Sequence, residues 1–288
     1  MSTVGILTDT TASIPESLVK ELGIEVVPYY VHRGLETLRD AIDIKTDTLA
    51  RYLESATELP TTSNPAPGDY LNGFNQLTKR TRDIVALTMT SKGSGAFQSC
   101  RAAVNILREK LPQVHIEVVD TLQVAMSQGW AAIEAARAAV GGLSIDSVVE
   151  KASLVARKGM MLQTADTLRY LQMGGRIGRA QHLVGSLLNI KPIIGMQNGI
   201  IMAVGTARSR KKAYLRIVEL IHQQVGEGAC IKVAFTHVAA AEQLDQLRER
   251  VLENFECIEV LTSPLSPALA VHSGPGTVGV SFFPVDGG

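Results

Sequence analysis

Short hydroxyl side chains gather in two segments where a β-rich run gives way to a helical pattern, TTSNP at 61–65 and SKGSG at 91–95. Hydroxyl groups and backbone N–H groups at the start of a helix bind an anion without a formal positive charge. Ser and Thr are also preferred N-caps, so capping alone is the alternative for each loop. A cap needs only one hydroxyl, and glycines around Ser94 let a ligand approach the backbone. The two segments therefore predict an anion-binding site. Two other strand ends, LTDTTAS and VVDT, fit capping equally well.

Three glycines and Pro275 surround His272 near the end of the chain, in AVHSGPGTVGV at 270–280. Glycine permits positive φ and close approach, and proline fixes φ, so the pattern predicts a tight loop of defined shape. Such a loop either holds a ligand or only turns a helix into the last strand. On this segment alone the second interpretation is favoured.

Motifs for nucleophilic catalysis, nucleotide binding and metal binding do not occur in the sequence. It has no GxSxG elbow and no GxxxxGK[ST] loop, and GGRIG at 174–178 departs from GxGxxG by an arginine in the third place. Cys100, Cys230 and Cys257 are far apart, without CxxC or a histidine at ligand spacing. We therefore expect no cofactor and no metal. Positive charges at 208–212 open a predicted helix, where they oppose its dipole and so require an explanation.

Composition limits the classes of partner. Lys+Arg and Asp+Glu both number 28 in 288 residues, so there is no general attraction to nucleic acid or to an anionic membrane. The apolar runs stop well before the roughly 18 residues that a membrane span needs. The start, MSTVGILTDTT, lacks the basic and apolar regions of a signal peptide. We expect a cytoplasmic protein without integral membrane insertion.

The elements that must position these loops alternate in the first half of the chain. Strands are predicted at 4–9, 25–31, 83–89 and 115–120, with helices between them at 13–23, 46–56, 67–80 and 95–111. This alternation predicts a mostly parallel sheet with helices on both faces. Ligands collect at the carboxyl ends of such strands, where the hydroxyl-rich segments lie. Two further helices are expected after residue 123 and at 145–159.

The second half has a different pattern. Two apolar runs joined by Asn198-Gly199 predict a hairpin, hence antiparallel pairing, and strands are also expected at 159–165, 231–237 and 277–283. Helices are expected at 167–175, 209–226 and 240–255. The fold class is thus α/β with two domains. Residues 1–158 form the N-terminal parallel-sheet domain, and residues 159–288 form a C-terminal α/β domain with a largely antiparallel sheet.

Taken together, these segments resemble the DegV family of bacterial fatty-acid-binding proteins. The matching residues run in order from Ile6 to Gly279: ILTDTTASIP, TTSNP, TSKGSGAFQS, VVDT, LRYLQMGGRI, IKPIIGMQNGII, TARSRKKA and HSGPGTVG. The resemblance implies two α/β domains with an apolar tunnel between them, in which a long-chain fatty acid binds. It also implies a carrier subunit without its own catalytic step, which presents the carboxylate to a separate ATP-binding fatty acid kinase subunit for phosphorylation to acyl phosphate.

The resemblance also implies the ligand-binding residues. Those near the fatty-acid carboxylate are Thr62, Ser63, Ser94 and Gly95. Those at the mouth, where a phosphate would later lie, are Arg208 and His272, with Arg176 in support. The second interpretation of AVHSGPGTVGV, as a mere turn, stays open beside this one.

The chain departs from the family pattern beside the head group. Where members more often read LSGTY, this chain has GSGAF at 93–97, so Gly93, Ala96 and Phe97 leave a hydroxyl and a phenol missing. Asn64 stands where glutamine is common, and Thr10 where serine is common. Fatty acid binding is expected to persist, whereas phosphorylation is less firmly implied. Two other functions stay open, an enzyme for acyl or phosphoryl transfer in the same cleft and a regulatory protein that responds to a small acid.

Overall fold

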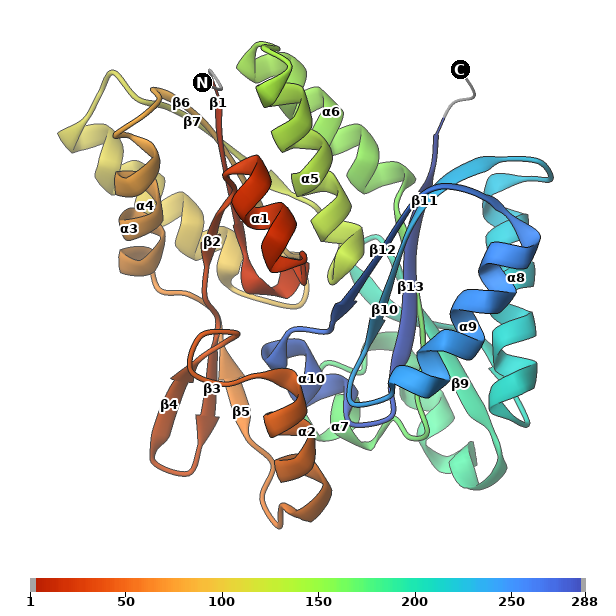
Figure 1. Ribbon diagram of the computed structural model, residues 1–288. Coiled ribbons are helices and arrows are strands. Elements are labelled where there is room, and N and C mark those ends of the chain that lie inside the picture. Colours follow the sequence, from red (N-terminus) through yellow and green to blue (C-terminus); the bar gives the residue numbers. More distant parts are fainter. Residues whose placement is uncertain (1–3, 286–288) are drawn as a thin grey trace.

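The computed structural model describes residues 4–285, with 184–189 as backbone, and its first layer is a parallel sheet (Figure 1). The strands lie in the order β2-β1-β6-β7 and are all paired in parallel. Their bounds are β1 Val4–Asp9, β2 Glu25–Val27, β6 Asp83–Thr88 and β7 His115–Asp120. Every residue of β1 is buried, as expected of a strand covered on both faces. The predicted parallel sheet is confirmed.

Helices cover both faces of this sheet. On one side Leu7 packs with Tyr70 and Phe74 of α3 (Pro67–Leu77) and with α4 (Ala96–Lys110). On the other side Ile6 packs with Leu18 of α1 (Glu16–Leu22) and with Trp130 of α5 (Met126–Val140), next to α6 (Ile145–Lys158). Side chains alternate along β1, and this alternation sends neighbouring residues into two different cores.

A six-stranded sheet forms the second layer, in the order β10-β9-β8-β13-β11-β12. Its strands are β8 Met160–Thr164, β9 Lys191–Gln197, β10 Ile200–Ala207, β11 Cys230–His237, β12 Glu256–Pro264 and β13 Val278–Pro284. Only β11 and β12 pair in parallel, so the prediction of a largely antiparallel sheet is confirmed. Asn198 and Gly199 both have positive φ in the β9–β10 turn, as the hairpin signal requires.

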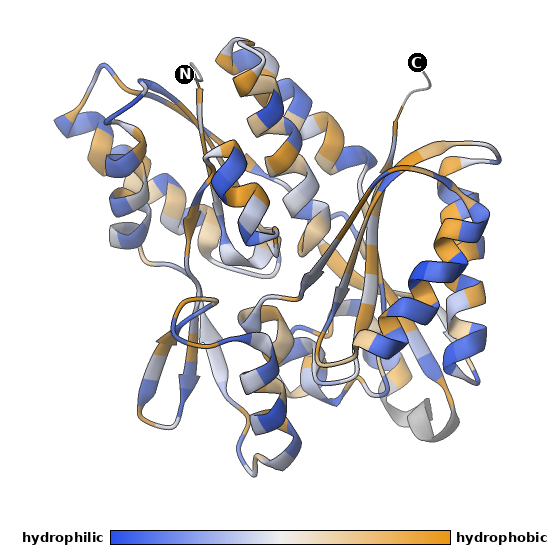
Figure 2. Cartoon of the chain, viewed as in Figure 1, coloured by the Kyte–Doolittle hydropathy of each residue, from blue (hydrophilic) through white to orange (hydrophobic). Residues whose placement is uncertain are grey.

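The outer face of this sheet is covered by α8 (Arg210–Val225) and α9 (Ala241–Asn254), which mix hydrophilic and hydrophobic residues along their length (Figure 2). The inner face packs on α5, where the Trp130 indole donates to the Ser281 carbonyl at 3.2 Å. The predicted boundary between 1–158 and 159–288 falls between α6 and β8. It stays a prediction, because α5 and α6 pack against both sheets.

A small antiparallel sheet, β4-β3-β5, corrects the sequence reading of the first half. Residues 25–31 were expected as one strand but form β2 and, after Pro28, the separate β3 (Tyr30–Arg33). Proline lacks the N–H that would continue the parallel ladder, so the chain leaves the first sheet there. β3 pairs with β4 (Glu36–Arg39) and with β5 (Thr61–Ser63), so the expected TTSNP loop begins as a strand. The α2 helix (Thr46–Ser55) connects β4 to β5.

The short remaining elements are η1 Thr10–Ala12, α7 Arg169–Met173, η2 Gly178–Asn189 and α10 Pro267–Ser273. His272 was expected inside the glycine loop, but it lies in the last turn of α10. Gly274, which follows this helix, has a φ of 81°. Strand β12 was not predicted, because polar residues interrupt its apolar pattern. Within residues 4–285, no helix combines the length and apolar character that crossing a bilayer requires.

Candidate functional site

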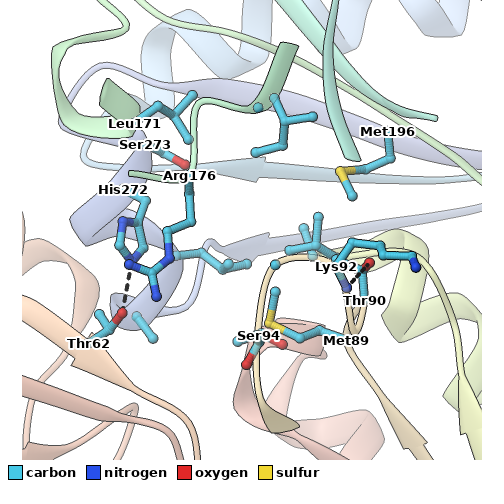
Figure 3. Close-up of a pocket in the computed structure, with 18 of the residues that line it drawn as sticks. Thr62, Met89, Thr90, Lys92, Ser94, Leu171, Arg176, Met196, His272 and Ser273 are labelled. Carbon is cyan, nitrogen blue, oxygen red and sulfur yellow. Dashed lines mark hydrogen bonds between the residues drawn. The ribbon is translucent and has the colours of Figure 1, made fainter. Parts of the chain in front are cut away.

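A cavity of about 500 Å³ lies where the carboxyl ends of the parallel strands meet β8, the β9–β10 hairpin and α10 (Figure 3). Its apolar wall includes Met89, Val124, Met161, Met196, Ile201 and Leu265. Its polar wall includes Thr62, Ser94, Arg176 and His272. An apolar space of this size with a few convergent polar groups is typical of a small-molecule site.

Thr62 and His272 meet at the polar wall. In β5 the side chains alternate, so Thr61 and Ser63 are exposed while Thr62 is half-buried and lines the cavity. Oγ1 of Thr62 lies 2.8 Å from Nε2 of His272 (Figure 3). Of the three successive hydroxyls, the middle one is therefore directed at the cavity.

Burial governs the charge of His272. Desolvation, and next the positive charge of Arg176, lower the pKa of its imidazole to about 4, so the ring is neutral at pH 7. Its Nδ1 is buried and has no hydrogen-bond partner among residues 4–285. A Cβ on Gly174 would lie 2.2 Å from this nitrogen, so only glycine at 174 leaves room for the imidazole in this position.

Arg176 brings a positive charge to the same place. One guanidinium nitrogen donates to the Gly174 carbonyl at 2.7 Å, and the guanidinium lies beside the His272 imidazole (Figure 3). Within the described part of the chain, no carboxylate forms a salt bridge with Arg176. The charge is available for an anionic ligand.

Ser94 is held by a residue that sequence reasoning missed. Its Oγ accepts from the N–H of Ala96 at 3.2 Å and lies 2.7 Å from the hydroxyl of Tyr29, which also lines the cavity. The N–H of Tyr29 donates to Oγ1 of Thr10 at 3.0 Å, which fixes the segment after Pro28. Burial raises the pKa of the Tyr29 phenol, so it stays protonated. A phenol is thus present at Ser94 even though Phe97 lacks one.

The other predicted residues differ in their placement. Ser63 lines the cavity, but its hydroxyl bonds to Nε2 of His32 at 2.9 Å on the exposed side of the small sheet. Gly95 also lines it, and a Cβ there would lie 3.0 Å from Oδ1 of Asn64. The structure does not bring Arg208 to the cavity, because this side chain is exposed beyond the end of β10.

Arg210, two residues after Arg208, is one of the positive charges at the start of α8, and its contacts account for its position there. It donates to the Gly276 carbonyl at 2.8 Å and pairs with Asp166 at 2.6 Å. It therefore ties the glycine loop after α10 to the residues that follow β8. The role proposed for Arg208 at the ligand stays a prediction without a contact to support it.

The LTDTTAS segment forms a buried polar support beneath the cavity. Asp9 caps η1 by accepting from the N–H of Thr11 at 3.0 Å, which is the capping interpretation of this loop. Asp40 accepts from the hydroxyl of Thr10 at 2.7 Å, and burial raises the pKa of its carboxyl to about 7. Within residues 4–285, no group of three or more His, Cys, Asp or Glu side chains is arranged to hold a metal ion.

Comparisons with known proteins found similar sequences and similar folds. A family model described as "Uncharacterised protein, DegV family" matches residues 3–285. A DegV domain-containing protein of Streptomyces coelicolor is 34% identical over 279 residues, which cover 96% of this chain and 97% of that protein. A solved structure described as "Fatty Acid Binding of a DegV family Protein from Thermus thermophilus" aligns with a TM-score of 0.92 at 28% identity, covering 99% of this chain and 100% of that one. The structure of DegV from Bacillus subtilis, described as a fatty acid binding protein, aligns with a TM-score of 0.87 at 26% identity, covering 99% and 100%.

Proposed function

The chain belongs to the DegV family, and we propose that it binds a long-chain fatty acid in the cavity, with the carboxylate at Thr62, Ser94 and Arg176. The observation that carries this proposal is the contrast between the two walls. Methionine and branched side chains form one, while the other is formed by hydroxyl groups and by a guanidinium that has no acidic partner among the described residues.

Each wall suits one part of a fatty acid. Burial of the acyl chain contributes about 0.8 kcal/mol per methylene, so the apolar wall supplies most of the affinity. A carboxylate removed from water must have its oxygens hydrogen-bonded, or desolvation costs several kcal/mol. Hydroxyl donors together with a planar guanidinium can satisfy those oxygens. Ser63 and Gly95 line the cavity and contribute to its shape. The Ser63 hydroxyl is not assigned to the carboxylate, because it is hydrogen-bonded to His32.

We further propose that the bound carboxylate is presented to a separate ATP-binding fatty acid kinase subunit in the cytoplasm. An acyl phosphate carries more negative charge and more acceptor oxygens than the acid, and an arginine suits both. Arg176 and His272 lie side by side at the polar wall, which supports this assignment. In this role the chain is a carrier, and the kinase partner supplies the chemical step.

Native mass spectrometry of the purified protein tests lipid binding. We expect a co-purified mass of fatty-acid size, which EDTA does not remove. In the double variant Thr62→Ala/Ser94→Ala the carboxylate loses donors, and binding should weaken by about 1–3 kcal/mol. Thr61→Ala is the matched control, because this hydroxyl is on the exposed side of β5. Unchanged lipid occupancy in the double variant would remove the carboxylate from this wall.

Phosphorylation has its own test. His272→Ala should keep the fatty acid bound but lose acyl phosphate formation with a kinase subunit and ATP. Lipid content and acyl phosphate are measured on the same preparation. Loss of lipid, with normal phosphorylation of what remains, would move His272 to the carboxylate.

The Thr62–His272 pair gives one reason to test an enzyme for acyl or phosphoryl transfer as a second candidate. A hydroxyl 2.8 Å from an imidazole resembles a nucleophile with its general base. The imidazole pKa of about 4 makes a weak base, however, and its Nδ1 has no orienting partner among the described residues. Turnover of acyl or phosphoryl esters by the isolated protein, abolished in Thr62→Val, would favour the enzyme.

A further inference from the structure

Gln163, in the middle of β8, places a carboxamide in the wall of the cavity. Its side chain lines the cavity and is only 5% exposed. Among residues 4–285, no hydrogen-bond partner meets its amide oxygen or nitrogen. Because the side chain lines the cavity, a ligand that fills the cavity buries the carboxamide, and a buried carboxamide left without a partner costs about 1–3 kcal/mol.

Gln163 has both apolar and hydroxyl-bearing neighbours, the latter including Thr236, Ser273 and Thr277. It pairs with Ile194 of β9 on one side and with Gly279 of β13 on the other. Met161, two residues earlier on the same face of β8, also lines the cavity. Leu171 of α7 lines it as well. A purely hydrocarbon ligand would offer the carboxamide no hydrogen-bond partner.

The neighbouring strand makes room for this side chain. A Cβ at position 279 would lie 2.8 Å from Cγ of Gln163, so the glycine opposite Gln163 accommodates it in its present position. Elsewhere in β13, Val278, Val280, Phe282 and Phe283 pack in the cores. Gly279 in β13 therefore leaves room for the long polar side chain of Gln163 on the neighbouring strand β8.

We propose that Gln163 is a specificity-determining residue, which selects a fatty acid with an oxygen substituent, a hydroxyl or an oxo group, on its acyl chain. The carboxamide both donates and accepts, so it pairs with either group. A site that hydrogen-bonds a ligand oxygen discriminates against the analogue without it, because its own buried polar group is then left unpaired. This inference rests on the proposed fatty-acid function and names the class of acid.

A competition experiment tests it. The delipidated protein is offered an equimolar mixture of octadecanoic acid and its monohydroxy and monooxo derivatives, with the oxygen at a series of chain positions. The bound masses are measured by native mass spectrometry. We expect one position to be enriched about tenfold over octadecanoic acid, the ratio that one satisfied buried hydrogen bond gives.

The variant Gln163→Met removes the carboxamide at nearly constant length. It should abolish the enrichment while octadecanoic acid binds as well as before or more tightly. Gln172→Met, on the exposed side of α7, is the matched control and should keep the enrichment. Both variants report a ratio within one sample, so a modest loss of folded protein does not change the result.

The outcomes separate the two proposals. Equal weakening of all acids in Gln163→Met would assign the carboxamide to the carboxylate and overturn the selectivity. Equal binding of plain and oxygenated acids by the unmodified protein would overturn it as well, while the fatty-acid function stands. Binding of none of the acids would overturn the fatty-acid function itself.

Discussion

Oγ1 of Thr62 and Nε2 of His272 lie 2.8 Å apart, although 210 positions separate the two residues in the chain. Thr62 comes from the small sheet, and His272 from the helix before the last strand. Other contacts join the same regions. The hydroxyl of Thr46 donates to the Leu265 carbonyl at 2.6 Å, and the N–H of Ser266 donates to Oγ of Ser13 at 3.0 Å. The polar wall of the cavity is thus assembled from both ends of the sequence, and α10 is fixed to the N-terminal half.

The Tyr29 hydroxyl is predicted to position Ser94 for the ligand. Oγ of Ser94 already accepts from the Ala96 N–H. If the phenol also donates to it, the Ser94 proton is left for the carboxylate. Tyr29→Phe should therefore weaken fatty acid binding by about 1 kcal/mol, roughly fivefold.

Tyr30→Phe is the matched control for this prediction, because its hydroxyl donates to Asp69 at 2.8 Å and does not line the cavity. Both variants are titrated with a fatty acid and unfolded with urea. A comparable loss of stability but a loss of binding only in Tyr29→Phe is the expected result. If both variants bind equally well, Tyr29 has a structural role alone.

Gly174 is predicted to be intolerant of a side chain for a steric reason. Its backbone lies in the right-handed region, so alanine is not strained there by conformation. A Cβ would lie 2.2 Å from Nδ1 of His272 and would displace the imidazole from Thr62. Gly174→Ala should destabilise the protein by about 1–3 kcal/mol and impair the proposed phosphorylation.

Gly68→Ala provides the comparison, because nothing lies within 4 Å of a Cβ there. Thermal unfolding of both variants is the measurement. A Gly174→Ala protein as stable as Gly68→Ala, with unchanged acyl phosphate formation, would show that the imidazole position is not constrained.

The elements were largely predictable, because their hydrophobic periods are local. The parallel sheet, the Asn198-Gly199 hairpin and the long helices all follow from patterns within about 15 residues. Pro28 itself signals the break between β2 and β3. The apolar residues on both sides of it nevertheless led to the prediction of one continuous strand. Strand β12 lacked a clear period and was missed.

The site was predictable in composition but not in its pairings. The hydroxyl-rich segments and the family resemblance pointed to Thr62 and Ser94. Ser94 follows β6 at the carboxyl edge of the parallel sheet, whereas Thr62 lies within β5 of the small antiparallel sheet, which was not predicted. The contact of Tyr29 with Ser94 spans 65 positions, and no local pattern encodes it. Arg208 and Arg210 are two positions apart on the chain, and the turn into α8 decides that Arg210 is directed inward. Residue type alone does not distinguish them.

Arg176 and Arg208 are therefore predicted to differ in their importance for the ligand. Arg176→Ala removes the positive charge beside His272, and fatty acid binding should weaken by about 1–3 kcal/mol. Arg208→Ala removes an exposed charge outside the cavity and should leave binding within about twofold. Titration with a fatty acid at two salt concentrations is the measurement. Equal losses in both variants would return Arg208 to the head-group site.

Two buried groups are predicted to give the stability opposite slopes against pH. The pKa of His272 is about 4 in the folded protein against 6.5 ordinarily, so the unfolded chain binds the extra proton between these values. Its contribution is present above pH 6.5 and is lost as the pH falls toward 4. The pKa of Asp40 is about 7 against 3.8, so the folded protein holds that proton. Its contribution is present below pH 3.8 and is lost as the pH rises through 7.

The two slopes overlap between about pH 4 and pH 6.5, where they oppose each other. One pKa unit corresponds to about 1.36 kcal/mol, so the free energy of unfolding changes by at most about 3 kcal/mol through His272 and about 4 kcal/mol through Asp40. Asp40→Asn removes one falling slope, so the difference in the free energy of unfolding between this variant and the unmodified protein should rise with pH through this window and be largest at pH 8. Asp245→Asn, exposed on α9, is the control and should follow the unmodified protein. Burial also raises the pKa of Asp9, which adds a falling slope of its own to every variant, so the difference between variants is the quantity compared. Urea unfolding from pH 4.5 to 8.5 measures the curves, and parallel curves for Asp40→Asn and the unmodified protein would mean that the Asp40 carboxyl is ionised in the folded state throughout.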